Sequence, residues 1–271
     1  MLTRSDYGEI IQLSMGKEMY GQIPYAMSVF FVDGLLIDTG PFSVFPEAAD
    51  AFKDIPVKSV ICTHHHEDHI GNNTFFQDRE IPILAHELAA PLIVDPTLWT
   101  DRFMNYQKLL FDYPPPSACS SLDDFVEGNK YRFQVIHTPG HSHDHICLLE
   151  PQNSWLFTGD VFRGEKGRNF RVDEDFYVYM ATIEKLLDYD FDTIFCCSGV
   201  IFDNAKQRMR NKLAWWRELR DQVFEKTRQG CEPEEIRAQL LGNENIITQF
   251  TEGDSSKINL VHAILKKYPN D

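Results

Sequence analysis

Four side chains of the types that bind metal ions lie close together in the stretch THHHEDHIGN at residues 63–72. They are His64, His66, Asp68 and His69. Imidazole nitrogens and carboxylate oxygens are ligands that both zinc and iron accept. Histidines buried together without a metal would leave polar atoms unpaired, so the alternative is a solvated polar loop. The density of the cluster favours a metal site.

Two later segments carry side chains of the same types. One is HTPGHSHDH at 137–145, with His137, His141, His143 and His145, and the other is LFTGD at 156–160, which ends in Asp160. Each is a weak indication alone. A histidine in such a loop commonly forms hydrogen bonds, and an aspartate after a Thr-Gly turn commonly acts as a cap.

Taken in order, the three segments resemble the metallo-β-lactamase superfamily. The HxHxDH motif reads from His64 to His69, HTPGHS lies at 137–142, and TGD lies at 158–160. The resemblance covers residues of about 28 to 200. It implies an α/β fold, the αββα sandwich of two β-sheets flanked by helices.

The resemblance also implies a set of ligands. One metal site would be formed by His64, His66 and His141. A second site would be formed by Asp68, His69 and Asp160, with Asp160 bridging the two. The segment LLIDTGP is similar to an early strand of the family, in which Asp38 would support the metal loop without binding metal.

The remaining histidines are expected to have other roles. His65 lies between two ligands and should point away from the metal. Hydrogen bonding behind the ligands, or simple exposure, is expected for His137, His143 and His145. Structural roles are expected for His86 and His262.

The chain departs from the family pattern at one position. The family usually completes the second metal site with a histidine after the last core strand, and Val200 stands where that histidine would align. Three explanations are open. The second metal is bound weakly, or a nearby group takes part (Cys197, Ser198 or Asp203), or the protein works with one metal.

Metal-dependent hydrolysis is the function that the resemblance implies. A bound metal lowers the pKa of water to near neutrality and polarises a carbonyl group. We expect zinc as one or two ions, with iron as the alternative metal, and Asp68 as the group that orients the water or accepts its proton. Glyoxalase-II-like and lactonase-like relatives suggest a small-molecule substrate with a thioester, a lactone or a related ester.

Two other functions stay open. Relatives that are mononuclear iron persulfide dioxygenases bind iron through two histidines and a carboxylate, which His64, His141 and Asp160 would match. A non-catalytic metal-binding module is the third function, and retention of the other metal-site positions argues against it. Tyr177 and Tyr179 are candidates by position for stabilising an oxyanion, although core packing is the favoured role for both.

Short apolar runs predict the strands that deliver these loops. Two strands flank the turn Asp33-Gly34 within 28–39, and the others are expected at 57–63, 81–86, 131–138, 145–150, 154–159 and 192–199. Helical periodicity is clearest at 176–188, 203–229, 233–241 and 256–267. We therefore expect a catalytic domain over 1–202 and a helical C-terminal extension over 203–271. Within the first domain, the aromatic segment 91–126 is expected to form a helical insertion near the cleft.

The composition limits which partners and which cellular compartment we expect. The formal net charge is −15, and the acidic excess lies in residues 1–202, so nucleic acid is not an expected partner. We expect no membrane partner either, since no apolar run is long enough for a membrane span and the N-terminus lacks a signal-peptide core. Six cysteines without a framework spacing indicate reduced thiols and a cytoplasmic protein. The apolar face of the helical extension packs either on the core or on another subunit, which leaves a homo-oligomer open.

Overall fold

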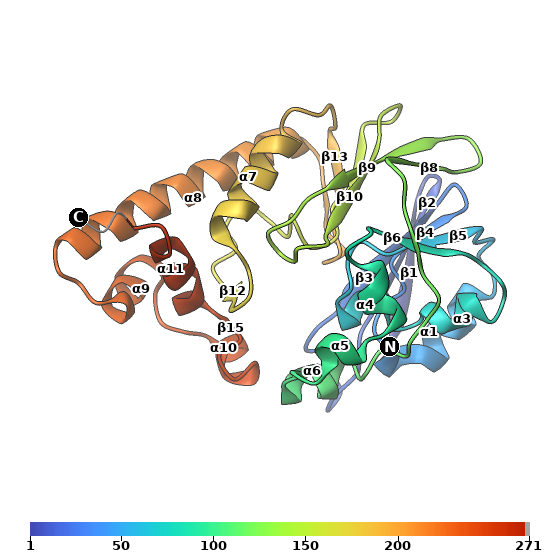
Figure 1. Ribbon diagram of the computed structural model, residues 1–271, viewed down its shortest axis with the longest axis horizontal. Helices are drawn as coiled ribbons and strands as arrows, with labels where there is room; N and C mark the ends of the chain where they lie inside the picture. Colours follow the sequence, from blue (N-terminus) through green and yellow to red (C-terminus); the bar gives the residue numbers. More distant parts are fainter. Residues whose placement is uncertain (269–271) are drawn as a thin grey trace.

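Two β-sheets packed face to face form the centre of the computed structural model, which describes residues 1–268 (Figure 1). The first sheet has seven strands in the order β1-β2-β3-β4-β5-β6-β7. Their bounds are Leu2–Tyr7, Ile10–Met15, Met27–Val32, Leu35–Ile37, Ser59–Ile61, Ile83–Ala85 and Ser120–Ser121. The pairs β1–β2, β2–β3 and β3–β4 are antiparallel, and the pairs β4–β5, β5–β6 and β6–β7 are parallel.

The second sheet has six strands in the order β14-β13-β11-β10-β9-β8. In chain order they are β8 (Phe125–Glu127), β9 (Arg132–His137), β10 (Ile146–Glu150), β11 (Trp155–Phe157), β13 (Thr193–Phe195) and β14 (Ile201–Phe202). Strands β11 and β13 are parallel. A small third sheet pairs β12 (Phe170–Arg171) with β15 (Ser255–Ser256).

Helices cover the outer faces of both sheets. Those that precede β9 are the 3-10 helix η1 (Phe42–Val44), α1 (Phe45–Phe52), α2 (Glu67–Ile70), α3 (Asn73–Gln77), α4 (Ala90–Val94), α5 (Thr97–Thr100) and α6 (Asn105–Leu110). Those that follow it are α7 (Phe176–Leu186), α8 (Ala205–Arg228), α9 (Pro233–Leu241), α10 (Ile246–Phe250) and α11 (Lys257–Leu265). Side chains of α1, α3 and α4 pack on the first sheet, and side chains of α7, α8 and α11 pack on the second. The layers therefore form the predicted αββα sandwich.

Strand β3 shows why the sheets form two separate cores. All six of its residues are buried. Because successive side chains of a strand point to opposite faces, Val29 and Phe31 pack under the helices of the first sheet, whereas Phe30 contacts the second sheet. The Phe30 ring lies 5.8 Å from that of Phe157 and 5.7 Å from that of Phe195, as ring-centroid distances.

Most of the predicted elements are confirmed, with two differences. The N-terminal hairpin of β1 and β2 was not predicted, because the outer strand β1 is mostly exposed and offers no alternating apolar pattern. The predicted insertion at 91–126 is helical only as far as Leu110. Three consecutive prolines at 114–116 follow, and each lacks the amide hydrogen that a continuing helix needs.

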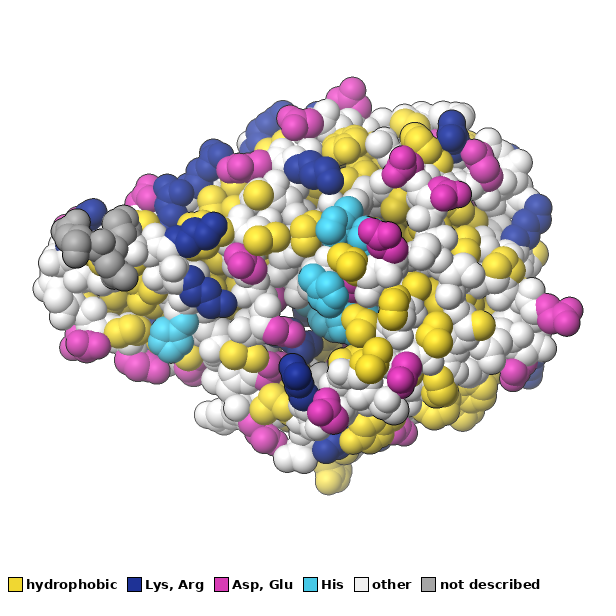
Figure 2. All heavy atoms as spheres, viewed as in Figure 1, with side chains coloured by type: hydrophobic (Ala, Val, Ile, Leu, Met, Phe, Trp, Pro, Cys, Tyr) yellow, Lys and Arg dark blue, Asp and Glu magenta, His cyan; other side chains and the backbone are white. Residues whose placement is uncertain are grey.

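The helices after β13 pack together at the end of the molecule that carries the C-terminus (Figure 1). Trp216 of α8 is 2% exposed and anchors this contact against Phe176 of α7, with a ring distance of 5.4 Å. Figure 2 shows histidine side chains gathered where the surface is hollowed between these helices and the sandwich. Within residues 1–268, no helix combines the length and the apolar character that crossing a membrane requires.

Candidate metal centre

The three histidine- and aspartate-bearing segments meet at one edge of the sandwich. The loop 62–66 follows β5, His141 follows β9, and Asp160 follows β11. Strands β9 and β11 are both antiparallel to β10, so they run in the same direction and end at the same edge. Short strands that stop together thus bring loops from distant parts of the sequence to one point.

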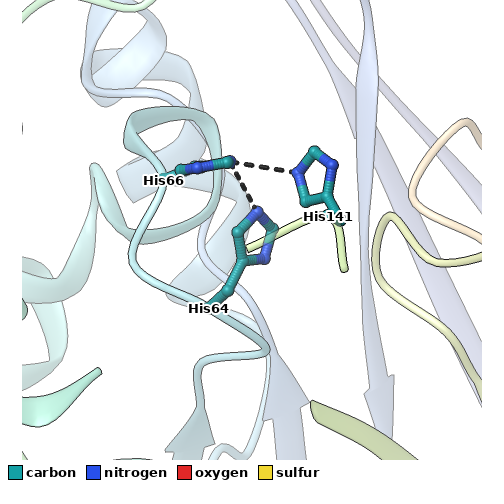
Figure 3. A group of neighbouring side chains, drawn as sticks. All are labelled: His64, His66 and His141. Atoms are coloured by element: carbon teal, nitrogen blue, oxygen red, sulfur yellow. Dashed lines mark hydrogen bonds between the residues drawn. The ribbon is translucent and has the colours of Figure 1, made fainter. Parts of the chain in front are cut away.

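Three imidazole rings converge there from two of these loops (Figure 3). The Nδ1 atom of His66 lies 3.0 Å from His64 Nε2 and 3.1 Å from His141 Nε2. All three residues are at most 5% exposed. One nitrogen from each ring faces the same small space, which is the arrangement of a three-histidine metal site.

A second group of ligand atoms lies beside the first. His69 Nε2 is 3.4 Å from Asp160 Oδ1 and 3.8 Å from Asp68 Oδ2. This nitrogen is buried and has no hydrogen-bond partner in the described part of the chain. A buried polar atom without a partner is costly, and a metal ion would satisfy it. The ligand atoms that converge at this second point come from His64, His69 and Asp160, so these three donors fit a cation, and Asp68 lies beside them.

Asp38 contacts the proposed metal loop, in the supporting role that the family resemblance implies. Its carboxylate accepts hydrogen bonds from the Thr63 amide at 2.7 Å and from the Thr63 hydroxyl at 2.9 Å. It also lies 2.7 Å from His69 Nδ1, which leaves the opposite nitrogen, Nε2, directed at Asp160. Asp38 itself has a φ of 63°, a conformation that costs energy for a residue with a side chain.

The other histidines of the two clusters contact protein groups instead of the centre. His65 Nδ1 lies 3.0 Å from both carboxylate oxygens of Asp144. His145 Nε2 accepts the amide hydrogen of Asp160 at 3.2 Å, and His137 Nε2 donates to the His143 carbonyl at 2.8 Å. These contacts agree with the supporting roles expected for the histidines that flank the proposed ligands.

Glu174 is a supporting residue that the sequence did not indicate. It lies just before α7, and its Oε1 is 2.7 Å from His141 Nδ1. Its other oxygen accepts the Arg171 amide hydrogen at 2.9 Å, which fixes the carboxylate. A carboxylate behind a ligating histidine sets the tautomer and raises the basicity of the ring. Glu174 holds His141 with Nε2 free to face the centre.

Glu174→Gln is expected to lower the affinity of the three-histidine site for metal by about 10- to 100-fold, the usual cost of removing such an outer partner. Titration of metal-free protein with zinc and a competing chelator measures this. Glu184→Gln is the control, because it makes the same change at an exposed glutamate of α7 that pairs with Arg217. Equal zinc affinity in the Glu174 variant and the native protein would show that the carboxylate does not hold the ligand.

The surroundings shift the pKa values of the proposed ligands in different directions. Burial, followed by the neighbouring imidazoles, holds the pKa of His64 well below its ordinary value, so the ring is neutral and its lone pair is free. Burial alone would raise the pKa of Asp160, but Arg163 and His141 hold it well below the usual range. Burial would lower the pKa of His69, but Asp38 and Asp68 raise it well above its ordinary value. That excess of negative charge around His69 would also attract a cation.

The chain after β13 brings a thiol to the second group. Cys197 is 2% exposed, and its Sγ donates to Asp160 Oδ1 at 2.5 Å. Val200, the position aligned with the missing histidine, is 47% exposed. Of the other two candidates, the Ser198 hydroxyl contacts Cys196 Sγ at 3.3 Å, and Asp203 is exposed. Cys197 is therefore the candidate that contacts a proposed metal ligand.

A cleft of about 530 Å³ opens over the centre, and His66, Asp68, His141 and Asp160 are among its lining residues. The Tyr25 hydroxyl, not anticipated from the sequence, donates to Asp68 Oδ2 at 2.9 Å. The Tyr179 hydroxyl donates to the backbone carbonyls of Asp160 and Val161, and that of Tyr177 donates to the Ile264 carbonyl. Neither hydroxyl is free for an oxyanion, in agreement with the packing role favoured for both.

Residues 28–198, more than half of the chain, match the sequence model of the Metallo-beta-lactamase superfamily. Lactamase-like protein notP of an Aspergillus species is 25% identical over 75% of this chain and 57% of its own length. An atrochrysone carboxyl ACP thioesterase of Emericella nidulans is 27% identical over 66% of this chain and 52% of its own length. The chain thus spans less than two thirds of the length of these relatives.

Solved structures show the same fold. A metallo-beta-lactamase family protein from Thermus thermophilus matches 96% of this chain and 94% of its own, with a TM-score of 0.69 and 17% identity. A second solved protein, in a di-iron-bound form, matches 68% of this chain and 93% of its own, with a TM-score of 0.54 and 24% identity.

Proposed function

This chain belongs to the metallo-beta-lactamase superfamily, and from that membership we propose that it is a metal-dependent hydrolase that cleaves a thioester, a lactone or a related ester. The convergence of His64, His66 and His141 on one buried point is the observation that carries the proposal. The relatives named as thioesterases support a hydrolytic reaction.

We assign the proposed ligands in two groups. The first ion would be held by His64, His66 and His141, and the second by Asp68, His69 and Asp160. Zinc is the proposed metal, because nitrogen-rich sites with an open position are typical of catalytic zinc. When bound, zinc would lower the pKa of water and polarise the carbonyl of the substrate.

The chain's own residues would position the substrate and move the proton. Asp68 lines the cleft and receives a hydrogen bond from Tyr25, so one carboxylate oxygen is held while the group remains able to accept a proton. Besides these polar groups, the cleft is lined by the apolar side chains of Leu110, Phe111 and Ile247. That combination suits a small molecule with an apolar acyl part.

We further propose that residues 1–202 form the catalytic domain and that 203–271 form an extension which helps to shape the cleft. Helix α8 contributes Lys212 and Trp216 to the cleft wall, and Ile246, Ile247 and Phe250 come from α10.

A mononuclear iron persulfide dioxygenase is the second candidate. One contact favours the dioxygenase. His141 Nε2 lies 3.4 Å from Asp160 Oδ2, so two of the three ligands proposed for iron lie close together. However, His66 Nδ1 lies between the other two imidazoles, so three histidines converge where that enzyme would use two. The hydrolase is therefore the better supported function.

The proposal is tested by supplying zinc-loaded protein with a panel of acyl thioesters and lactones and by measuring glutathione persulfide oxidation in parallel. We expect hydrolysis of at least one ester class and no oxygen uptake. Oxygen uptake by iron-loaded protein, with every ester left intact, would favour the dioxygenase. Failure of metal-loaded protein on both panels would support the non-catalytic binding module.

A further inference from the structure

Cys197 lies where a ligand is missing from the proposed second site. Its Sγ contacts Asp160 Oδ1, and the same oxygen lies 3.4 Å from His69 Nε2. His69 Nε2 is itself buried without a hydrogen-bond partner among residues 1–268. Thus the Cys197 thiol and the unpartnered nitrogen of His69 both lie near the same carboxylate oxygen of Asp160.

From this geometry we infer that Cys197 is a ligand of the second metal ion, in place of the histidine that the family pattern would supply. This inference rests on the proposed metal site. Thiolate sulfur, imidazole nitrogen and carboxylate oxygen are all accepted by zinc, so Asp68, His69, Asp160 and Cys197 make a compatible set of four. Cys197 would bind the metal as the thiolate, and its proton, which now lies against Asp160, would leave to solvent.

Cobalt(II) tests this ligand without any need for turnover. A cobalt ion bound to a thiolate gives a charge-transfer absorption in the near ultraviolet, which imidazole and carboxylate ligands do not give. We expect this band to develop with the second equivalent of cobalt, because the three-histidine site fills first. Cys197→Ser should abolish the band and weaken the second equivalent alone.

Cys196→Ser is the matched control, because the Cys196 thiol is also buried but contacts the Ser198 hydroxyl. Removing it should leave the band unchanged. Cys197→His should restore binding of the second equivalent without the band. Two cobalt ions bound with no charge-transfer band, one ion bound at saturation, or a band that persists in Cys197→Ser would each overturn the inference. The spectrum does not depend on hydrolysis, so it is independent of whether the proposed reaction is correct.

A second, independent observation concerns a lysine in the lining of the same cleft. Lys212 of α8 is 5% exposed, and its Nζ donates to the Gly164 carbonyl at 3.3 Å. Within residues 1–268, no carboxylate lies within ion-pair distance of Nζ. Arg163 and Arg171, which also line the cleft, lie 3.3 Å from Asp160 and from Asp173, respectively. Lys212 is thus a buried cation that lacks the acidic partner its neighbours have.

Trp216 also lines the cleft and contacts Lys212. Its indole nitrogen is buried without a hydrogen-bond partner in the described chain. Its ring lies 4.3 Å from Lys212 Nζ, and this cation–π contact compensates only part of the cost of burying the ammonium group. A buried ammonium group without a carboxylate partner and an indole nitrogen without an acceptor line the cleft that also holds the proposed metal site, and together they indicate a ligand that brings an acidic acceptor.

We infer that the substrate carries a carboxylate in addition to the bond that is cleaved, and that Lys212 and Trp216 bind this carboxylate. The inference rests on the proposed function, because the cleaved bond would lie at the metal centre in the same cleft. An ammonium group and a nearby N–H donor suit a carboxylate. The substrate class is then an acidic ester or thioester.

Binding of product-like acids tests the carboxylate site separately from turnover. We would titrate the zinc-loaded protein with a series of α,ω-dicarboxylates and with monocarboxylates of equal carbon number. At least one dicarboxylate should bind roughly 10- to 100-fold more tightly than its monocarboxylate partner, which is the effect of one charged hydrogen bond. Lys212→Met should remove this difference while the zinc content stays the same.

Lys226→Met is the control, because it removes the same charge from α8 about 21 Å further along the helix. The control should preserve the preference for dicarboxylates. Equal binding of every pair by the native protein, or a preference that survives in Lys212→Met, would overturn the inference. A protein that prefers dicarboxylates but hydrolyses no ester would instead refute the proposed reaction and leave the anion site standing.

Discussion

Alanine at His64, His66 or His141 is expected to remove tight metal binding and turnover together. Each ring supplies one of three nitrogens that face the same point, and a three-ligand site that loses a ligand also loses its geometry. The loss of zinc affinity should exceed about 100-fold, the upper end for removing an outer-sphere partner. Zinc content after dialysis, with hydrolysis of the best ester on the same samples, measures both effects.

His262→Ala is the control for those variants, because His262 lies on α11 and is exposed. It should keep native zinc content and native turnover. Circular dichroism should show that the three ligand variants fold, since the sandwich has its own hydrophobic core. Full zinc content and normal turnover in any one of the three would remove that histidine from the site.

Asp68→Asn is expected to lower turnover by about 100- to 10,000-fold, the range for losing a positioned proton acceptor. The amide keeps the shape of the carboxylate and can still accept the hydrogen bond from Tyr25. It cannot accept a proton from the attacking water. The zinc ion at the three histidines should remain bound, because Asp68 is not among its proposed ligands.

Rates at saturating substrate, compared with zinc content, distinguish this effect from loss of metal. Asp101→Asn, which changes an exposed acid, should leave both unchanged. Native turnover in Asp68→Asn would exclude Asp68 as the proton acceptor, whichever metal is bound.

Local patterns predicted the strands that lead to the proposed metal loops, and the resemblance of three motifs to a known family predicted the sandwich. Strand β3 is apolar on both faces and β5 runs directly into the histidine cluster, so both could be recognised in short windows of sequence. His64 and His66 are two residues apart and belong to a dense motif. His141 and Asp160 were identified only because the three motifs occur in order, since each is a common loop residue.

Residues that act through long-range contacts could not be predicted in the same way. Glu174 lies 33 positions from His141, and Tyr25 lies 43 positions from Asp68. Neither belongs to a motif, and only the packing of separate loops brings them to the site. Cys197 could be named only as one of three candidates, because sequence does not determine which side chain a turn directs inward.

The helical tail illustrates the same limit. Periodicity predicted α8 and the burial of one face. That Lys212 would be buried on this helix, beside the cleft and without a carboxylate partner, follows only from how α8 packs on the second sheet. Lysines on an amphipathic helix are ordinarily solvated, so helical periodicity alone does not indicate a buried one.

Restoring metal to stripped protein is the most direct test of metal-dependent hydrolysis at the three histidines. The protein would be freed of metal with a chelator and titrated with zinc while hydrolysis of an acyl thioester or lactone is followed. We predict that hydrolysis is absent at first and rises with the ion that occupies His64, His66 and His141. The same titration of His141→Ala should give no rise. Hydrolysis that persists in metal-free protein, or that returns equally in His141→Ala, would contradict the account.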